Sequence, residues 1–178
     1  MPDMPASVQI RLATLADAPA LAAVHIRSWQ WAYRGQLSDE YLDRMSESLD
    51  QRIEARRTEL ANLPPAARWW VAEQDGQLVG FAMTEPSRDA DAPTLTGEVR
   101  AIYLAYAAAG KGIGRALFAH AVADLRQRGY RQATLWVLES NARARRFYEA
   151  ASFAPDGARK TEERPGALLH EVRCAITF

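Results

Sequence analysis

Apolar residues recur along the chain with two different spacings, one typical of helices and one of strands. Between Thr14 and Tyr33 they return every three or four residues, which predicts a helix that ends near Gly35. Thr14 and Asp17 have the spacing of a capping box at the start of this helix. The same helical spacing over residues 39–61 predicts a second helix.

Alternating patterns and short apolar runs predict the strands. We expect six strands, over residues 8–13, 68–74, 77–86, 94–105, 131–139 and 168–178. The Asp-Gly pair at 75–76 predicts a hairpin, and two more helices are expected over 112–129 and 141–151. This order predicts an α/β (α+β) fold in a single domain over 1–178. Its central sheet is expected to be mixed, mostly antiparallel and of six to seven strands, flanked by about four helices.

The composition of the chain argues against some classes of binding partner. The chain of 178 residues balances 22 Lys and Arg against 22 Asp and Glu, so no overall charge favours a nucleic acid or an anionic membrane. The single cysteine, Cys174, lies in an apolar run and is expected to be a small buried hydrophobe. Residues 1–7 are expected to be a frayed tail without a signal peptide. No apolar run reaches the roughly 18 residues of a membrane helix, so we expect a cytoplasmic protein.

The segment "AAAGKGIGRA" at residues 107–116 lies between a predicted strand and a predicted helix. Such a glycine loop offers free backbone N–H groups and the positive end of a helix dipole, so a phosphate group is its expected ligand. A P-loop is excluded, because Ala105 and Gly112 stand where a glycine and a hydroxyl residue are needed. The dinucleotide fingerprint is excluded because Arg115 stands at its last glycine. A turn without a ligand stays as the alternative.

Two segments, "GEVRAIYLAYAAAGKGIGRALFAHAV" and "LWVLESNARARRFYEAASF", resemble the two signature motifs of the GNAT superfamily of N-acetyltransferases. Together they span about residues 97–153. The positions that match the motifs are Gly112, Gly114, Asn141, Ala144, Phe147, Tyr148 and Phe153. The chain departs from the pattern at Ala109, where the motif has Arg or Gln, and at Ser152, where it has Gly.

The resemblance implies an acetyl-CoA-dependent N-acetyltransferase that needs no metal. The backbone N–H groups that would hold the pyrophosphate belong to Ala109, Gly110, Lys111, Gly112, Ile113, Gly114 and Arg115. Ile102, Tyr103 and Leu104 would pair their backbone with the pantetheine arm as with one more strand. Asn141 would contact the amide groups of that arm, cap its own helix, or do both. The side chains of Lys111 and Arg115 would lie near phosphate or in solvent.

Acetyl transfer to an amine requires two proton movements, because the ammonium must lose a proton and the departing thiolate must be stabilised. The resemblance implies that Tyr148 is the general acid; the alternative is that its ring only packs at the helix edge. Glu98 is the candidate base. It lies four and six residues before Ile102 and Leu104, so in a regular strand it shares their face. A chain of waters is the alternative base.

The acceptor is expected to be a primary amine of a small molecule or peptide, bound beside the helices at about residues 14–61. Trp29 and Tyr33 share a helix face and are expected either to form a wall of this pocket or to pack in the core. An acidic cluster at Asp89 and Asp91 would attract a cationic acceptor.

Among the three histidines, which have no metal-ligand spacing, only His170 is expected near the acceptor. A non-catalytic acyl-CoA-binding or regulatory module on the same fold is the alternative function. A homodimer that pairs through the last strands is also expected to be possible.

Overall fold

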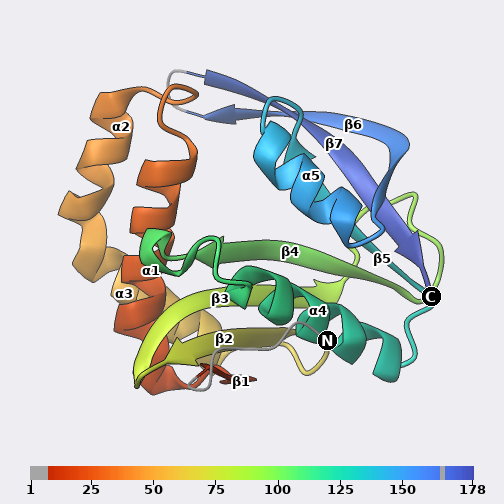
Figure 1. The fold of residues 1–178 in the computed structure, drawn as a ribbon, viewed down its shortest axis with the longest axis horizontal. Helices are drawn as coiled ribbons and strands as arrows, with labels where there is room; N and C mark the ends of the chain where they lie inside the picture. The colour runs from red at the N-terminus through yellow and green to blue at the C-terminus, as the bar shows by residue number, and fades with distance from the viewer. Residues whose placement is uncertain (1–7, 165–166) are drawn as a thin grey trace.

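The computed structural model describes residues 8–164 and 167–178, so the predicted tail at 1–7 lies outside the described residues. Within them one seven-stranded sheet carries five α-helices, with the strand order β1-β2-β3-β4-β5-β7-β6 (Figure 1). The strands are β1 (Val8–Leu12), β2 (Arg68–Gln74), β3 (Gln77–Pro86), β4 (Thr96–Leu104), β5 (Gln132–Leu138), β6 (Ala154–Arg164) and β7 (Ala167–Thr177). The helices are α1 (Ala18–Ala32), α2 (Asp39–Arg44), α3 (Leu49–Ala61), α4 (Ile113–Gln127) and α5 (Ala142–Ala150). The predicted fold class is confirmed.

The sheet is antiparallel throughout except where β4 and β5 meet. These two strands are parallel, and they pair only from Thr96, Gly97 and Glu98 to residues 132–134. Beyond this short ladder they separate, and in Figure 1 β4 crosses the view while β6 and β7 rise away from it. The half of β4 after Glu98 keeps β3 on one side and has no strand partner among the described residues on the other.

Helices cover both faces of the sheet because both faces carry apolar residues that must be buried. On one face Trp69, Val71 and Phe81 pack against Leu21 and Val24 of α1. On the other face, small residues of β2 and β3 leave room for α4; this cluster includes Ala72, Ala82, Ile113, Leu117 and Ala121. α5 lies beside α4, with the Phe118 and Phe147 rings 5.4 Å apart. The buried Cys174 belongs to the core cluster beneath them, as predicted.

Two elements differ from the sequence prediction. The helix predicted over 39–61 is interrupted by a 3-10 turn at Met45–Ser48, which separates α2 from α3 and gives five helices rather than four. Ser48 Oγ donates to the Met45 carbonyl oxygen at 2.9 Å, and such side-chain bonds compete with helical ones. β6 was not predicted because its sequence is charged, contains Pro155 and Gly157, and is largely exposed at the sheet edge.

Candidate active site

The glycine loop presents a row of free backbone N–H groups. Gly110 and Gly112 have φ angles of +77° and +79°, a left-handed conformation in which other residues are strained. This conformation starts α4 at Ile113, and within residues 8–164 and 167–178 no acceptor takes the N–H groups of residues 110–115. Ala109 differs from the prediction, because its N–H already donates to the Tyr106 carbonyl oxygen at 3.0 Å. The free N–H groups therefore begin at Gly110.

A cleft of about 430 Å³ opens where β4 and β5 separate. We call it the β4–β5 cleft. It brings together eight of the predicted site residues, which are Tyr33, Ile102, Tyr103, Leu104, Ala109, Gly114, Asn141 and Tyr148. Asn141 also caps α5, since its Oδ1 accepts from the Ala144 N–H at 3.0 Å. The side chains of Lys111 and Arg115 are exposed, and neither lines this cleft.

A second cavity of about 630 Å³ lies between α1, α3 and the sheet, and we call it the α1–α3 cavity. The predicted wall residues Trp29 and Tyr33 both line it, and their rings lie 4.7 Å apart. The two spaces meet along a shared wall, which consists of Tyr33, Ile102, Tyr103, Trp136, Leu138, Tyr148 and Glu171. A group that enters from one side can therefore approach a group that enters from the other.

Tyr148 belongs to this shared wall. Its ring packs against Phe118 at 5.4 Å and Phe147 at 5.3 Å, so the predicted packing at the helix edge is present. Burial raises the pKa of Tyr148 well above its ordinary value, and the nearby Tyr33 and Tyr103 raise it further. Its phenol stays protonated across the physiological range, as a proton donor must.

Glu98 reaches the α1–α3 cavity, but not by the alternation that the sequence predicted. A β-bulge leaves Arg100 without a partner on β3, because Ala101 pairs with Met83 while Val99 pairs with Thr84. The extra residue reverses the alternation of β4, so Glu98 does not share the face of Ile102.

The carboxylate of Glu98 is engaged by a neighbouring cation. Glu98 is 2% exposed, and Arg88 Nη2 donates to its Oε1 at 2.9 Å. The backbone N–H and Nε of Arg88 both lie 3.4 Å from Oε2. Both carboxylate oxygens of the predicted base therefore contact Arg88, a residue that the sequence analysis did not select.

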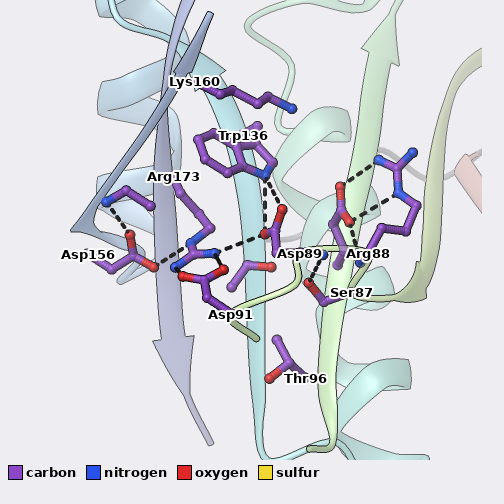
Figure 2. Close-up of polar contacts among 12 residues, drawn as sticks. Ser87, Arg88, Asp89, Asp91, Thr96, Trp136, Asp156, Lys160 and Arg173 are labelled. Carbon is purple, nitrogen blue, oxygen red and sulfur yellow. Dashed lines mark hydrogen bonds and ion pairs between the residues drawn. The ribbon is translucent and has the colours of Figure 1, made fainter. Parts of the chain in front are cut away.

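Asp89 and Asp91 do not form the free acidic cluster that the sequence suggested. Arg173 Nη1 donates to Asp89 Oδ2 at 3.1 Å, and the same guanidinium holds both oxygens of Asp91 at 2.7 and 2.8 Å. Trp136 Nε1 and Asp156 complete the group, as Figure 2 shows. The guanidinium of Arg173 and the indole of Trp136 use these carboxylates, so they are not available to a cationic acceptor.

The histidine that lines the α1–α3 cavity is His25, whereas His170, the histidine expected near the acceptor, does not line it. His170 is exposed on β7 and borders a different depression of the surface. Burial, together with Arg56 and Arg52, lowers the pKa of His25 to about 3. His25 is therefore neutral near pH 7, and its low pKa makes it a poor proton acceptor. The sequence indicated only that His25 lies in a predicted helix. That does not tell whether its side chain packs in the core or lines a cavity.

Comparison with known proteins decides the family. The model of the Acetyltransferase (GNAT) family matches residues 24–153. The chain belongs to this family. It is 31% identical over 165 residues to a probable N-acetyltransferase of Mycobacterium tuberculosis, covering 86% of this chain and 83% of the relative. It is 29% identical over 167 residues to an uncharacterized N-acetyltransferase of Bacillus subtilis, covering 93% and 90%.

Solved GNAT structures have the same fold. The PaiA N-acetyltransferase of Thermoplasma acidophilum, solved in complex with coenzyme A, superposes with a TM-score of 0.68 at 22% identity, over 97% of this chain and 99% of that one. This GNAT protein is thus an acetyl-CoA-dependent acetyltransferase rather than the non-catalytic module considered from the sequence. No helix in the part of the chain that the structure describes has the length and apolar character to cross a membrane.

Proposed function

We propose that this acetyltransferase transfers the acetyl group of acetyl-CoA directly to a primary amine of a small molecule or peptide, with both substrates bound at once. The observation that carries the proposal is the shared wall of the β4–β5 cleft and the α1–α3 cavity, with Tyr148 in it. Two spaces that meet at one proton donor suit the direct reaction of two bound substrates.

The β4–β5 cleft fits acetyl-CoA, which supplies the acetyl group as a thioester when bound. The free N–H groups of residues 110–115 would hold the pyrophosphate, at the end of α4 where the helix dipole favours an anion. The open backbone edge of Ile102, Tyr103 and Leu104 would take the pantetheine arm, with Asn141 nearby. Lys111 and Arg115 would add positive charge around the phosphates. Residues 97–153 thus form the proposed acetyl-CoA side.

The α1–α3 cavity is the proposed acceptor side, with one side formed by the helices at about 14–61 and most of the remaining wall by the sheet. Trp29 and Tyr33 would be walls that exclude water from the amine. Tyr148 would donate its proton to the departing sulfur, since burial keeps the phenol protonated. Glu98 is the proposed base. Arg88 contacts both of its carboxylate oxygens, and we propose that the proton of the amine reaches Glu98 through a water.

Replacing Tyr148 with Phe tests the acid role. With an amine panel and thiol release as the readout, we expect Tyr148→Phe to lower kcat by about 100-fold with little change in the KM for acetyl-CoA. Tyr130→Phe is the matched control, because it removes a phenol outside both cavities. An unchanged kcat in Tyr148→Phe would show that another group is the acid. If Glu98→Gln leaves kcat and its pH profile unchanged, water alone is the base.

A further inference from the structure

The wall of the α1–α3 cavity carries more positive than negative side chains. Six basic residues line it, namely Arg52, Arg56, Arg88, Arg100, Lys160 and Arg164. Four acidic residues line it, namely Glu59, Glu98, Glu162 and Glu171. An excess of positive charge is unusual for a site whose acceptor contains an amine, so the location of each charge matters.

Each of the four carboxylates already has a basic partner on the same wall. Arg88 holds Glu98 at 2.9 Å, Lys160 lies 3.3 Å from Glu171, and Arg164 lies 2.6 Å from Glu162. Arg56 pairs with Glu59 on α3. The charge of each carboxylate is thus balanced by a cation of the same wall, and among the described residues the one buried carboxylate oxygen there that accepts no hydrogen bond is Oε2 of Glu171, beside Lys160.

Two basic residues stay outside these four pairs. Arg100 approaches only Glu85, which does not line the cavity, at 3.8 Å, and Arg88 already occupies the same oxygen at 2.9 Å. Arg52 forms no ion pair with any carboxylate of the described residues, and its Nε donates to Ser48 Oγ at 3.0 Å. The terminal nitrogens of Arg52 are free to bind an anion.

The residues around Arg52 also favour the binding of an anion. Arg56 is one helical turn further along α3, and its Nε is buried without an acceptor in the described part of the chain. His25 faces Arg56 across 3.4 Å between Nδ1 and Nη2, and it is neutral, so it adds no negative charge. A hydrogen-bond acceptor that entered here would meet the donors of Arg52 and Arg56, and the neighbouring carboxylate of Glu59 is already paired with Arg56.

We propose that the acceptor is an amine that also carries a carboxylate, as an amino acid does, and that Arg52 on α3 binds this carboxylate. The inference rests on the proposed function, because it assigns the α1–α3 cavity to the acceptor. Arg52 holds the carboxylate at the α3 side of the cavity, which leaves the amine to face the shared wall with Tyr148. A polyamine is disfavoured, since its second ammonium would meet a wall with six cations and four carboxylates, each of them paired with a cation.

Pairs of acceptors that differ only in the carboxylate test whether the site requires its negative charge. Thiol release from acetyl-CoA is measured with the twenty L-amino acids and 4-aminobutyrate, with the carboxamide of each, and with putrescine and spermidine. We expect at least one acid to be used with a kcat/KM about tenfold or more above that of its carboxamide. If only carboxamides or polyamines are used, the acetyl transfer stands and the carboxylate inference is overturned. If no amine in the panel is used, the carboxylate inference is overturned, and thiol release with peptide acceptors then decides the proposed acetyl transfer.

Variants of Arg52 then locate the contact. We expect Arg52→Gln to raise the KM for the best acid about tenfold, with kcat and the KM for its carboxamide nearly unchanged. Arg52→Lys should retain part of the effect and also serves if the glutamine variant is unstable. Arg57→Gln is the control, since Arg57 is exposed on the same helix, pairs with Glu54 and lies outside the cavity. Equal changes in KM for the acid and the carboxamide would refute a role for Arg52 in binding the carboxylate.

Discussion

His25 should make the protein lose stability on mild acidification, well before its carboxylates titrate. Its side chain is 8% exposed and lies between Tyr103, at 4.7 Å between ring centroids, and Trp29, at 5.5 Å. Burial is the main cause of its low pKa, and the positive charges of Arg56 and Arg52 add to it. Replacement by Gln removes the titrating group and keeps a polar side chain.

The size of this loss of stability follows from the difference in proton binding between the folded and the unfolded state. The pKa of His25 is about 3 in the folded protein and 6.5 when the chain is unfolded. Between these values the unfolded state binds one more proton, so the free energy of unfolding falls as pH falls, by about 1.4 kcal/mol per pH unit. From pH 6.5 to pH 5 this amounts to about 2 kcal/mol, a large part of the typical 5–15 kcal/mol.

Urea unfolding at pH 7.5 and pH 5.0 measures the effect. The free energy of unfolding of the wild type should be about 2 kcal/mol lower at pH 5.0 than at pH 7.5. For His25→Gln this decrease should be about 2 kcal/mol smaller, whatever the stability of the variant at pH 7.5. His170→Gln is the control, because His170 is exposed. The reasoning is refuted if His25→Gln loses as much stability on acidification as the wild type does.

Two further predictions concern stability. Ser152 has a φ of +68°, so Ser152→Gly should raise the free energy of unfolding by about 0.5–1 kcal/mol in urea; a decrease would mean that the serine side chain stabilises this turn. Arg173→Met should lower the free energy of unfolding by about 2 kcal/mol, because three aspartates lose their cation. Arg159→Met, at an exposed ion pair with Glu139, should change it by less than about 0.5 kcal/mol, and equal effects of the two variants would contradict the argument.

The elements that the sequence predicted correctly have signals in neighbouring residues. α4 buries Ile113, Leu117 and Leu125 along one stripe, so its apolar residues have a helical period. β2 and β3 are short apolar runs on either side of a left-handed turn at Asp75 and Gly76. Ser152, where the family motif has glycine, has a left-handed conformation with a φ of +68°.

The features that were missed depend on contacts between distant parts of the chain. Among the described residues, the strand partner of β6 is β7 alone, and the exposed residues of β6 show no apolar period. The bulge at Arg100 exists only relative to β3, so a regular alternation misplaced Glu98. Arg173 and Asp91 are 82 positions apart, and nothing in either local sequence indicates that they pair. The residues of the motif could therefore be identified from the sequence. The residues that bind Glu98 and Asp89, which are Arg88 and Arg173, could not.

The separation of β4 and β5 explains why this polar network lies beside the site. Parallel strands are held at a fixed distance by their ladder of hydrogen bonds, and here the ladder ends at Glu98, where the cleft begins. Side chains from the loop between β3 and β4 connect the two sides instead. Arg88 binds Glu98 of β4, and the adjacent Asp89 binds Trp136 of β5 and Arg173 of β7. Since Trp136 lines both the cleft and the cavity, loss of Arg173 should loosen the shared wall as well as the fold, and acetyl transfer by Arg173→Met should fall even where that variant stays folded.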